Sequence, residues 1–337
     1  PHLSKAITAA MLALCVSASA LAAELTAEDY QRVVDEAHAK FKDVKEGANA
    51  DYIPILATVP SDMFGIAIVT RDGKIYSAGE QDYKFSIQSV SKPFTAALIM
   101  AEQGPKVLRE KIGVEPTGLP FNSKMALELY DARSVNPLVN AGAIAAVSLV
   151  QAKSEKERWE KVANNINDFA GRELEVLEEV YDSEYESSWS NRGIANLLYN
   201  YERLYSDPEE ALRVYTRQCS IGINTRDLGI MGATLANEGV NPITGKKLLD
   251  KDDVPELLAI MATAGFYDES GEWMYRSGLP AKTGVGGGIV AVVPGKFAIA
   301  TFSPPLNPAG NSVRGLKAIG YIAAKLGVGL YGPNKGE

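Results

Sequence analysis

Apolar side chains recur at helical spacing between Thr26 and Val44. Residues three and four apart lie on one side of a helix, so this spacing gathers them on a single face. Thr26 and Asp29 stand three residues apart at the start of the segment, in the arrangement of a capping box. The pattern predicts an amphipathic helix over this segment. Its apolar face consists of Tyr30, Val33, Val34, Ala37, Phe41 and Val44.

Two pairs of β-rich segments flank turn-forming tripeptides. The first pair is FGIAIVT (64–70) and KIYSAG (74–79), and the second is GGGIVAVV (286–293) and FAIATFS (297–303). The tripeptides between them are Arg-Asp-Gly at 71–73 and Pro-Gly-Lys at 294–296. Each combination predicts a β-hairpin.

Between these hairpins the hydrophobic pattern is mostly helical. The segments are 91–104, 140–152, 156–170, 191–204 and 225–239, with the last expected to end on a Gly239 cap, and a final helix is expected over 312–326. This order predicts an α/β protein of the α+β type. One antiparallel sheet would be built from N- and C-terminal strands, packed with helices and joined to a helical subregion. No linker or repeat divides residues 23–337, which we expect to form a single domain.

The first 22 residues have the features of a secretory signal peptide. Lys5 precedes an apolar run from Ile7 to Val16, and small residues ending in Ala20-Leu21-Ala22 follow. We therefore expect an exported protein, periplasmic or secreted. No later stretch reaches the roughly 20 apolar residues of a membrane span. The net charge of -8, without a dense basic tract, argues against nucleic acid as a partner.

Cysteine and histidine are too scarce for several kinds of site. Cys15 lies in the leader, which leaves Cys219 unable to form an internal disulfide. The two histidines are His2, also in the leader, and His38, expected to be a half-exposed helix residue. A Ser-His-Asp triad or a histidine-built metal site is therefore not expected. We predict no metal and no cofactor.

The candidate chemistry begins with Ser89 and Lys92 in FSIQSVSKPFTAAL, at an expected helix start. Residues three apart share a helix face, so the amine can reach the hydroxyl. A lysine base requires a pKa lowered by about three units, and the apolar flank favours such a shift. S-x-x-K is a weak motif alone. A later Lys282-Thr283-Gly284 at a strand completes the pairing found in serine β-lactamases and penicillin-binding proteins, although a glycine-rich bulge would also explain this segment.

A longer set of segments resembles the serine-dependent glutaminase family. The matching segments are YIPILA, FSIQSVSKPF, EPTGLPFNS, NPLVNAGAI, YDSEYESSWSNRGIANLL, YTRQCSI, LANEGVNPITG, AGFYDESGEWMYRSGLPAKTGVGGGI and NSVRGLKAI. The resemblance implies a β-lactamase/transpeptidase-like fold and hydrolysis of L-glutamine to L-glutamate and ammonia. The family's Cys-Gly-Met-Tyr-Asp is Ala-Gly-Phe-Tyr-Asp at 264–268 here, and its Lys-Ser-Gly is Lys-Thr-Gly.

The resemblance also implies roles for individual residues. Ser89 would be the nucleophile and Lys92 its base, and the backbone N–H groups of Ser89 and Val285 would hold the oxyanion. Tyr267, with Tyr52, would deliver a proton to the leaving ammonia. The residues expected around the substrate are Gln88, Asn140, Glu184, Asn191 and Tyr215. Glutaminases of this type are commonly homo-oligomers, so a dimer or tetramer is expected.

Other interpretations of these residues remain open from sequence alone. Without the family, Glu184 is most simply a solvated acid and Asn191 most simply a helix N-cap. A β-lactamase or transpeptidase of the same fold is an alternative function, although no S-D-N motif supports it. A sensor module that is acylated at Ser89 but turns over too slowly for catalysis is another.

Overall fold

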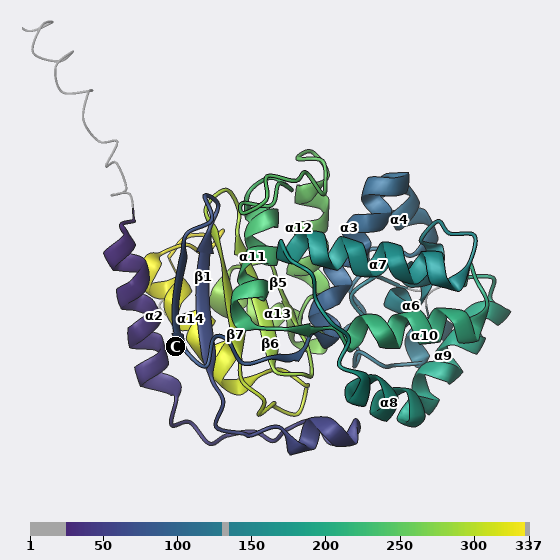
Figure 1. Ribbon diagram of the computed structural model, residues 1–337, viewed down its shortest axis with the longest axis horizontal. Coiled ribbons are helices and arrows are strands. Elements are labelled where there is room, and N and C mark those ends of the chain that lie inside the picture. The colour runs from purple at the N-terminus through teal and green to yellow at the C-terminus, as the bar shows by residue number, and fades with distance from the viewer. Residues whose placement is uncertain (1–24, 130–134, 334–337) are drawn as a thin grey trace, which may run out of the picture.

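The computed structural model describes residues 25–129 and 135–333 (Figure 1). Its main sheet has five antiparallel strands in the order β2-β1-β7-β6-β5. The strands are β1 (Gly65–Thr70), β2 (Ile75–Gly79), β5 (Ala281–Thr283), β6 (Gly288–Val293) and β7 (Phe297–Phe302). β1 pairs with β7, with Ile68 opposite Ile299, so the first and last hairpins form one sheet as predicted.

Helices cover both faces of this sheet, which explains the continuous apolar runs of β1, β6 and β7. α2 (Ala27–Phe41) and α14 (Val313–Leu326) pack together over one face. α11 (Thr225–Ala236) lies against β1, β6 and β7 on the other face. Every residue of β1, β6 and β7 is buried, so neither side of these strands requires polar residues.

The helical subregion lies beside the sheet, at the right of Figure 1. Its helices are α3 (Lys92–Gln103), α4 (Pro105–Lys111), α5 (Met125–Leu129), α6 (Asn140–Leu149), α7 (Glu155–Ala170), α8 (Glu178–Ser187), α9 (Trp189–Asn200) and α10 (Pro208–Cys219). α12 (Val254–Ala264) and α13 (Ser270–Ser277) follow nearer the sheet. The remaining elements are η1 (Pro54–Thr58), η2 (Gln88–Ser91), η3 (Tyr267–Glu269) and the paired strands β3 (Phe85–Ser86) and β4 (Gly222–Ile223).

The helix ends predicted from the sequence agree with the structure at the start of α2 and differ at the end of α11. Thr26 and Asp29 form the predicted capping box at the start of α2, and His38 is half-buried with its ring stacked on Phe64. The expected end of α11 at Gly239 is wrong, because the helix ends at Ala236. Gly239 instead provides the left-handed backbone (φ +82°) of the turn beyond it.

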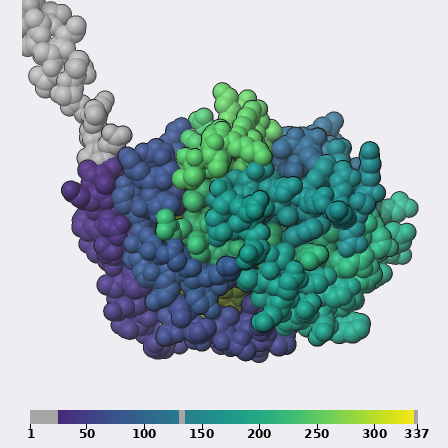
Figure 2. Space-filling view, in the orientation of Figure 1, coloured from purple at the N-terminus to yellow at the C-terminus, as the bar shows by residue number. Residues whose placement is uncertain are grey.

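The surface is hollowed where the N-terminal and helical parts meet. Figure 2 shows this hollow at the lower centre, between blue N-terminal and teal helical segments, with yellow C-terminal chain at its floor. The signal peptide predicted for residues 1–22 lies outside the described residues. Within the described part of the chain, no helix combines the length and apolar character needed to cross a membrane.

Candidate active site

Ser89 lies in the 3-10 helix η2, which leads directly into α3, and only 6% of its surface is exposed. Residues three apart eclipse one another in a 3-10 helix, so Ser89 and Lys92 share a side. The α-helix itself begins at Lys92, within one residue of the predicted segment 91–104, and Ser89 lies in the 3-10 turn before it. The preceding residue, Gln88, has a φ of +47°, a strained conformation for any residue with a Cβ. A strained residue beside a buried serine is typical of a functional site.

The loop after β5 passes close to this turn. A Cβ atom on Gly284 would lie 3.1 Å from the backbone nitrogens of both Ser89 and Val90, so glycine is needed for this approach. Val285, the next residue, is buried. In the part of the chain that the structure describes, neither the N–H of Ser89 nor that of Val285 donates to a protein acceptor. Two neighbouring segments thus each offer an unpaired donor, as an oxyanion hole requires.

Lys92 is almost completely buried, with 1% of its surface exposed. Its Nζ donates a hydrogen bond of 2.7 Å to Asn140 Oδ1. Burial lowers the pKa of Lys92 to about 8, and Cys219 and Glu184 partly oppose that shift. Within the described residues the Lys92 amine is hydrogen bonded to Asn140 rather than to Ser89. The amine therefore lies on the same side of the turn as the serine, with a pKa of about 8 that leaves a small neutral fraction at pH 7.

Tyr267 is buried at the start of η3, with a strained φ of +59°. Its hydroxyl donates to the backbone oxygen of Thr283 at 3.3 Å. Burial raises the pKa of Tyr267, so the phenol stays protonated. Tyr52 is 51% exposed at the rim, and the ring of Phe121 lies between the two tyrosines, at 6.2 Å from Tyr52 and 5.0 Å from Tyr267.

Asn140 is the centre of the polar network around Lys92. Its Oδ1 also accepts a hydrogen bond of 3.2 Å from the hydroxyl of Tyr215, and its Nδ2 donates to Asn191 Oδ1 at 3.0 Å. These three residues come from α6, α10 and α9. The interpretation of Asn191 as an N-cap is wrong, because it lies inside α9, whose N-cap is Ser188.

Glu184 on α8 has only 6% of its surface exposed, so its interpretation as a solvated acid is wrong. Its Oε2 accepts a hydrogen bond of 3.0 Å from Gln88 Nε2. Burial raises the pKa of Glu184 to about 7, while the bond from Gln88 and the charge of Lys92 act in the opposite direction. The structure thus brings all ten predicted residues into one region, with Tyr52 alone largely exposed.

A recess leads to this region from the surface. It has a volume of about 600 Å³, and its lining includes Tyr52, Phe121 and Val285. The recess therefore connects solvent with the proposed oxyanion donor and the tyrosine at the rim.

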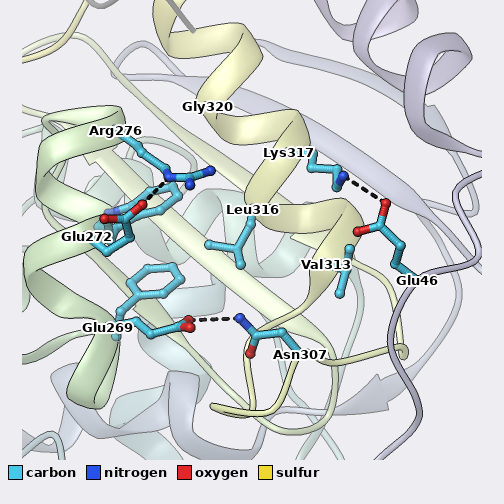
Figure 3. A pocket seen from close by; sticks show the side chains of 11 residues that line it. Glu46, Glu269, Glu272, Arg276, Asn307, Val313, Leu316, Lys317 and Gly320 are labelled. Carbon is cyan, nitrogen blue, oxygen red and sulfur yellow. Dashed lines mark hydrogen bonds and ion pairs between the residues drawn. The ribbon is translucent and has the colours of Figure 1, made fainter. Parts of the chain in front are cut away.

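A separate cavity of about 400 Å³ lies between α13 and α14 (Figure 3). Its polar lining residues are paired with one another: Glu269 accepts from Asn307 at 2.8 Å, and Lys317 donates to Glu46 at 3.1 Å. None of the ten predicted residues lines it. This cavity is therefore distinct from the Ser89 region.

Two buried polar residues near Ser89 received no role from the sequence. Gln218 Nε2 donates to Ser91 Oγ at 2.9 Å, and Ser91 Oγ donates to the backbone oxygen of Gln88 at 2.7 Å, which braces the strained turn. A polar residue on the apolar face of a helix would have been the signal for Gln218. Among the described residues, no group of three or more His, Cys, Asp or Glu side chains is arranged to hold a metal ion.

Solved structures similar to this chain include two described as probable glutaminases. A structure described as a probable glutaminase superposes with a TM-score of 0.90 at 50% identity, covering 91% of this chain and 99% of the other. A probable glutaminase from Bacillus subtilis, complexed with 6-diazo-5-oxo-L-norleucine, has a TM-score of 0.79 at 28% identity and covers 91% and 97% of the two chains. The mixed α/β fold with its antiparallel sheet is therefore the glutaminase, β-lactamase-like fold that the sequence predicted.

Sequence comparisons agree with the structural ones. The glutaminase family model matches residues 47–331. The glutaminase of Colwellia psychrerythraea strain 34H is 54% identical over 301 residues, which are 89% of this chain and 97% of the relative. Glutaminase 1 of Escherichia coli O6:H1 is 50% identical over 307 residues, which are 91% and 99% of the two chains. The chain therefore belongs to the glutaminase family and is a glutaminase enzyme.

Proposed function

We propose that this enzyme hydrolyses the side-chain amide of L-glutamine through a γ-glutamyl ester on Ser89. The Ser89 oxygen attacks the amide carbon while Lys92 takes its proton, and the N–H groups of Ser89 and Val285 stabilise the oxyanion. Loss of ammonia leaves the ester, which water then hydrolyses to L-glutamate. The observation that carries this proposal is a buried serine between an equally buried lysine and two unpaired N–H donors.

The lowered pKa of Lys92 makes the base step feasible. At its ordinary pKa of 10.5, the amine would be neutral in about one molecule in 3,000 at pH 7. With a pKa of about 8, the neutral fraction is about one in 11. The lowered pKa thus raises the concentration of the reactive base roughly 300-fold at pH 7.

Tyr267 supplies the proton that ammonia needs to leave. Burial raises the pKa of its phenol, so the phenol is protonated, and Ser89 is near enough to Tyr267 to affect that pKa. As the C–N bond breaks, the phenolic proton moves to the nitrogen, and the proton held by Lys92 restores the network. Tyr52 lies at the more exposed rim of the same site and assists in delivering this proton.

The remaining residues recognise the amino acid end of glutamine. Glu184 is the one carboxylate among the predicted residues, and it pairs with the substrate α-ammonium. Asn140, Asn191 and Tyr215 offer neutral donors for the α-carboxylate. Gln88 orients Glu184 through its 3.0 Å hydrogen bond.

Substitution of the dyad tests this mechanism. Ser89→Ala and Lys92→Ala should each lower kcat by orders of magnitude, and the double variant should be scarcely worse, because residues that act as a unit are non-additive. Ser86→Ala and Ser91→Ala are the matched controls on the same segment and should be far milder. Abolished activity in Ser91→Ala with activity retained in Ser89→Ala would show that the nucleophile is misassigned.

We also propose that the enzyme is exported and forms a homo-oligomer, either a dimer or a tetramer. Export rests on the leader pattern of residues 1–22, and a mature N-terminus near Ala23 in protein from a secreting host tests it. Association is supported by four exposed apolar side chains on α5 and α9, namely Met125, Leu129, Trp189 and Tyr199. Lys124 Nζ, just before α5, donates to Ser190 Oγ of α9 at 3.0 Å, so the starts of these two helices are close together. Light scattering of Trp189→Glu should show a smaller species than the wild type; an unchanged mass would exclude this face.

A further inference from the structure

Lys282 belongs to the Lys-Thr-Gly segment, and the proposed reaction gives it no role. It lies on β5 with 0% of its surface exposed. Its Nζ donates to the backbone oxygens of Thr283 at 2.6 Å and Gly265 at 3.2 Å. In the described part of the chain no carboxylate pairs with it. Burial, and after it the charge of Lys92, lowers the pKa of Lys282 well below its ordinary value. Such an environment is costly for an amine, so a functional explanation is warranted.

The Lys282 amine lies under the ring of Tyr267, with Nζ 4.1 Å from the ring centroid. It also shares an acceptor with that tyrosine, because the Tyr267 hydroxyl donates to the same Thr283 oxygen at 3.3 Å. Gly265 and Thr283, which accept the two bonds from Lys282, lie two residues before Tyr267 and Val285 respectively. Lys282 therefore fastens the tyrosine segment to the strand that leads into the oxyanion loop.

We propose that Lys282 is a positioning residue for Tyr267. It supports the ring from below and holds the strained backbone of η3 in place, so that the phenol stays at Ser89 when the C–N bond breaks. Its Nζ donates to two backbone oxygens and lies against the face of the Tyr267 ring, so Lys282 acts through Tyr267 and not on the substrate. This inference rests on the proposed function, in which Tyr267 protonates the leaving ammonia.

Two substrates that differ in their leaving group separate this role from general support of the fold. Glutamine releases ammonia, which needs a proton, whereas the γ-(4-nitrophenyl) ester of L-glutamate releases a phenolate that needs none. General acid catalysis contributes roughly 10²- to 10⁴-fold, so a misplaced acid should affect only the first substrate. Lys282→Met should lower kcat for glutamine by at least about 30-fold and kcat for the ester by less than about threefold, with little change in KM.

Arg314→Met is the matched control. Arg314 is another buried basic residue held by carbonyl oxygens, with Nε donating to Val44 at 2.9 Å and Nη1 to Ser61 at 2.9 Å. It has no ring contact with Tyr267 among the described interactions. This variant should lower the melting temperature while changing the rates for both substrates by the same factor.

The outcomes distinguish this inference from the reaction it rests on. Tyr267→Phe should show the same selective loss on glutamine, and Lys282→Met/Tyr267→Phe should be no worse than Tyr267→Phe alone. Equal losses on both substrates for Lys282→Met, with selective loss for Tyr267→Phe, would overturn the role of Lys282 only. Equal losses for Tyr267→Phe would remove the proposed proton donor and the inference with it. If Lys282→Met does not fold, Lys282→Gln replaces it in the same comparison, and Lys282→Arg should recover part of the glutamine rate.

Discussion

Neutralising Glu184 tests substrate recognition. Glu184→Gln keeps the size of the side chain and its capacity to accept the hydrogen bond from Gln88, but it removes the charge. Glu184 is 6% exposed, so the substrate ammonium would be left buried and unpaired. Removing one charge of such a buried pair costs about 2–5 kcal/mol of binding free energy. The lower limit corresponds to a loss of at least about 30-fold in kcat/KM for glutamine.

The pH dependence adds a second signature of the same carboxylate. The pKa of Glu184 is raised to about 7, so the group is ionised above that pH and becomes neutral below it. Wild-type kcat/KM should therefore fall as the pH decreases through 7, because protonated Glu184 cannot pair with the ammonium. The pH profile of kcat/KM for Glu184→Gln should lack this decrease near pH 7. It should keep the decrease that protonation of Lys92 causes.

The assay is ammonia release from glutamine and from an analogue that lacks the α-amino group. Both forms of the enzyme should hydrolyse the analogue equally poorly. Glu186→Gln is the matched control, since Glu186 is an exposed acid on the same helix. Exposed charges contribute well under 1 kcal/mol, so this variant should stay near wild type. A Glu184→Gln enzyme within threefold of wild type on glutamine would refute the assignment of the ammonium site.

Three further predictions concern the base, the oxyanion loop and the fold. The pKa of Lys92 is about 8 and only the neutral amine accepts a proton, so kcat should rise about tenfold between pH 7 and pH 9; a flat profile in stopped-flow or steady-state assays would exclude Lys92 as the base. Gly284→Ala places a methyl group 3.1 Å from the Ser89 nitrogen and should lower kcat at least about tenfold with little change in KM; an unchanged kcat would remove this N–H from the oxyanion hole. Thr26→Ala removes the hydrogen bond of 3.2 Å that the Asp29 N–H donates to Thr26 Oγ1. The free energy of unfolding, measured by denaturant titration, should fall by about 1 kcal/mol while kcat stays the same. A change in kcat would contradict the separation of α2 from the site.

The sequence predicts elements whose signals are local. Thr26 and Asp29 are three residues apart and bond to each other's backbone, so the start of α2 depends on nothing distant. The two hairpins are likewise set by short turns between β-rich segments. The union of these hairpins in one sheet followed from their position at both ends of a mostly helical chain.

Residues whose roles depend on distant partners could not be interpreted from pattern alone. Glu184 is surrounded by polar residues in sequence, and only its contact with Gln88, 96 positions away, shows that it is buried at the site. Asn191 has the residue type of a helix cap, yet its amide oxygen accepts from Asn140 on another helix. For both, the family resemblance predicted a place near the substrate, and the structure places both side chains in the region of Ser89. Lys282 was found by its motif, but its position under the Tyr267 ring required the fold.

The central claim is that glutamine hydrolysis proceeds through an ester on Ser89. The most direct measurement is rapid acid quenching of the enzyme during turnover of glutamine, followed by peptide mass spectrometry. We predict one γ-glutamyl group on the peptide that contains Ser89, located on that residue by fragmentation, and none in Ser89→Ala. Added hydroxylamine should divert the same ester to γ-glutamyl hydroxamate. A γ-glutamyl group on Ser91 or another residue, or full turnover with neither ester nor hydroxamate formed, would contradict the proposed mechanism.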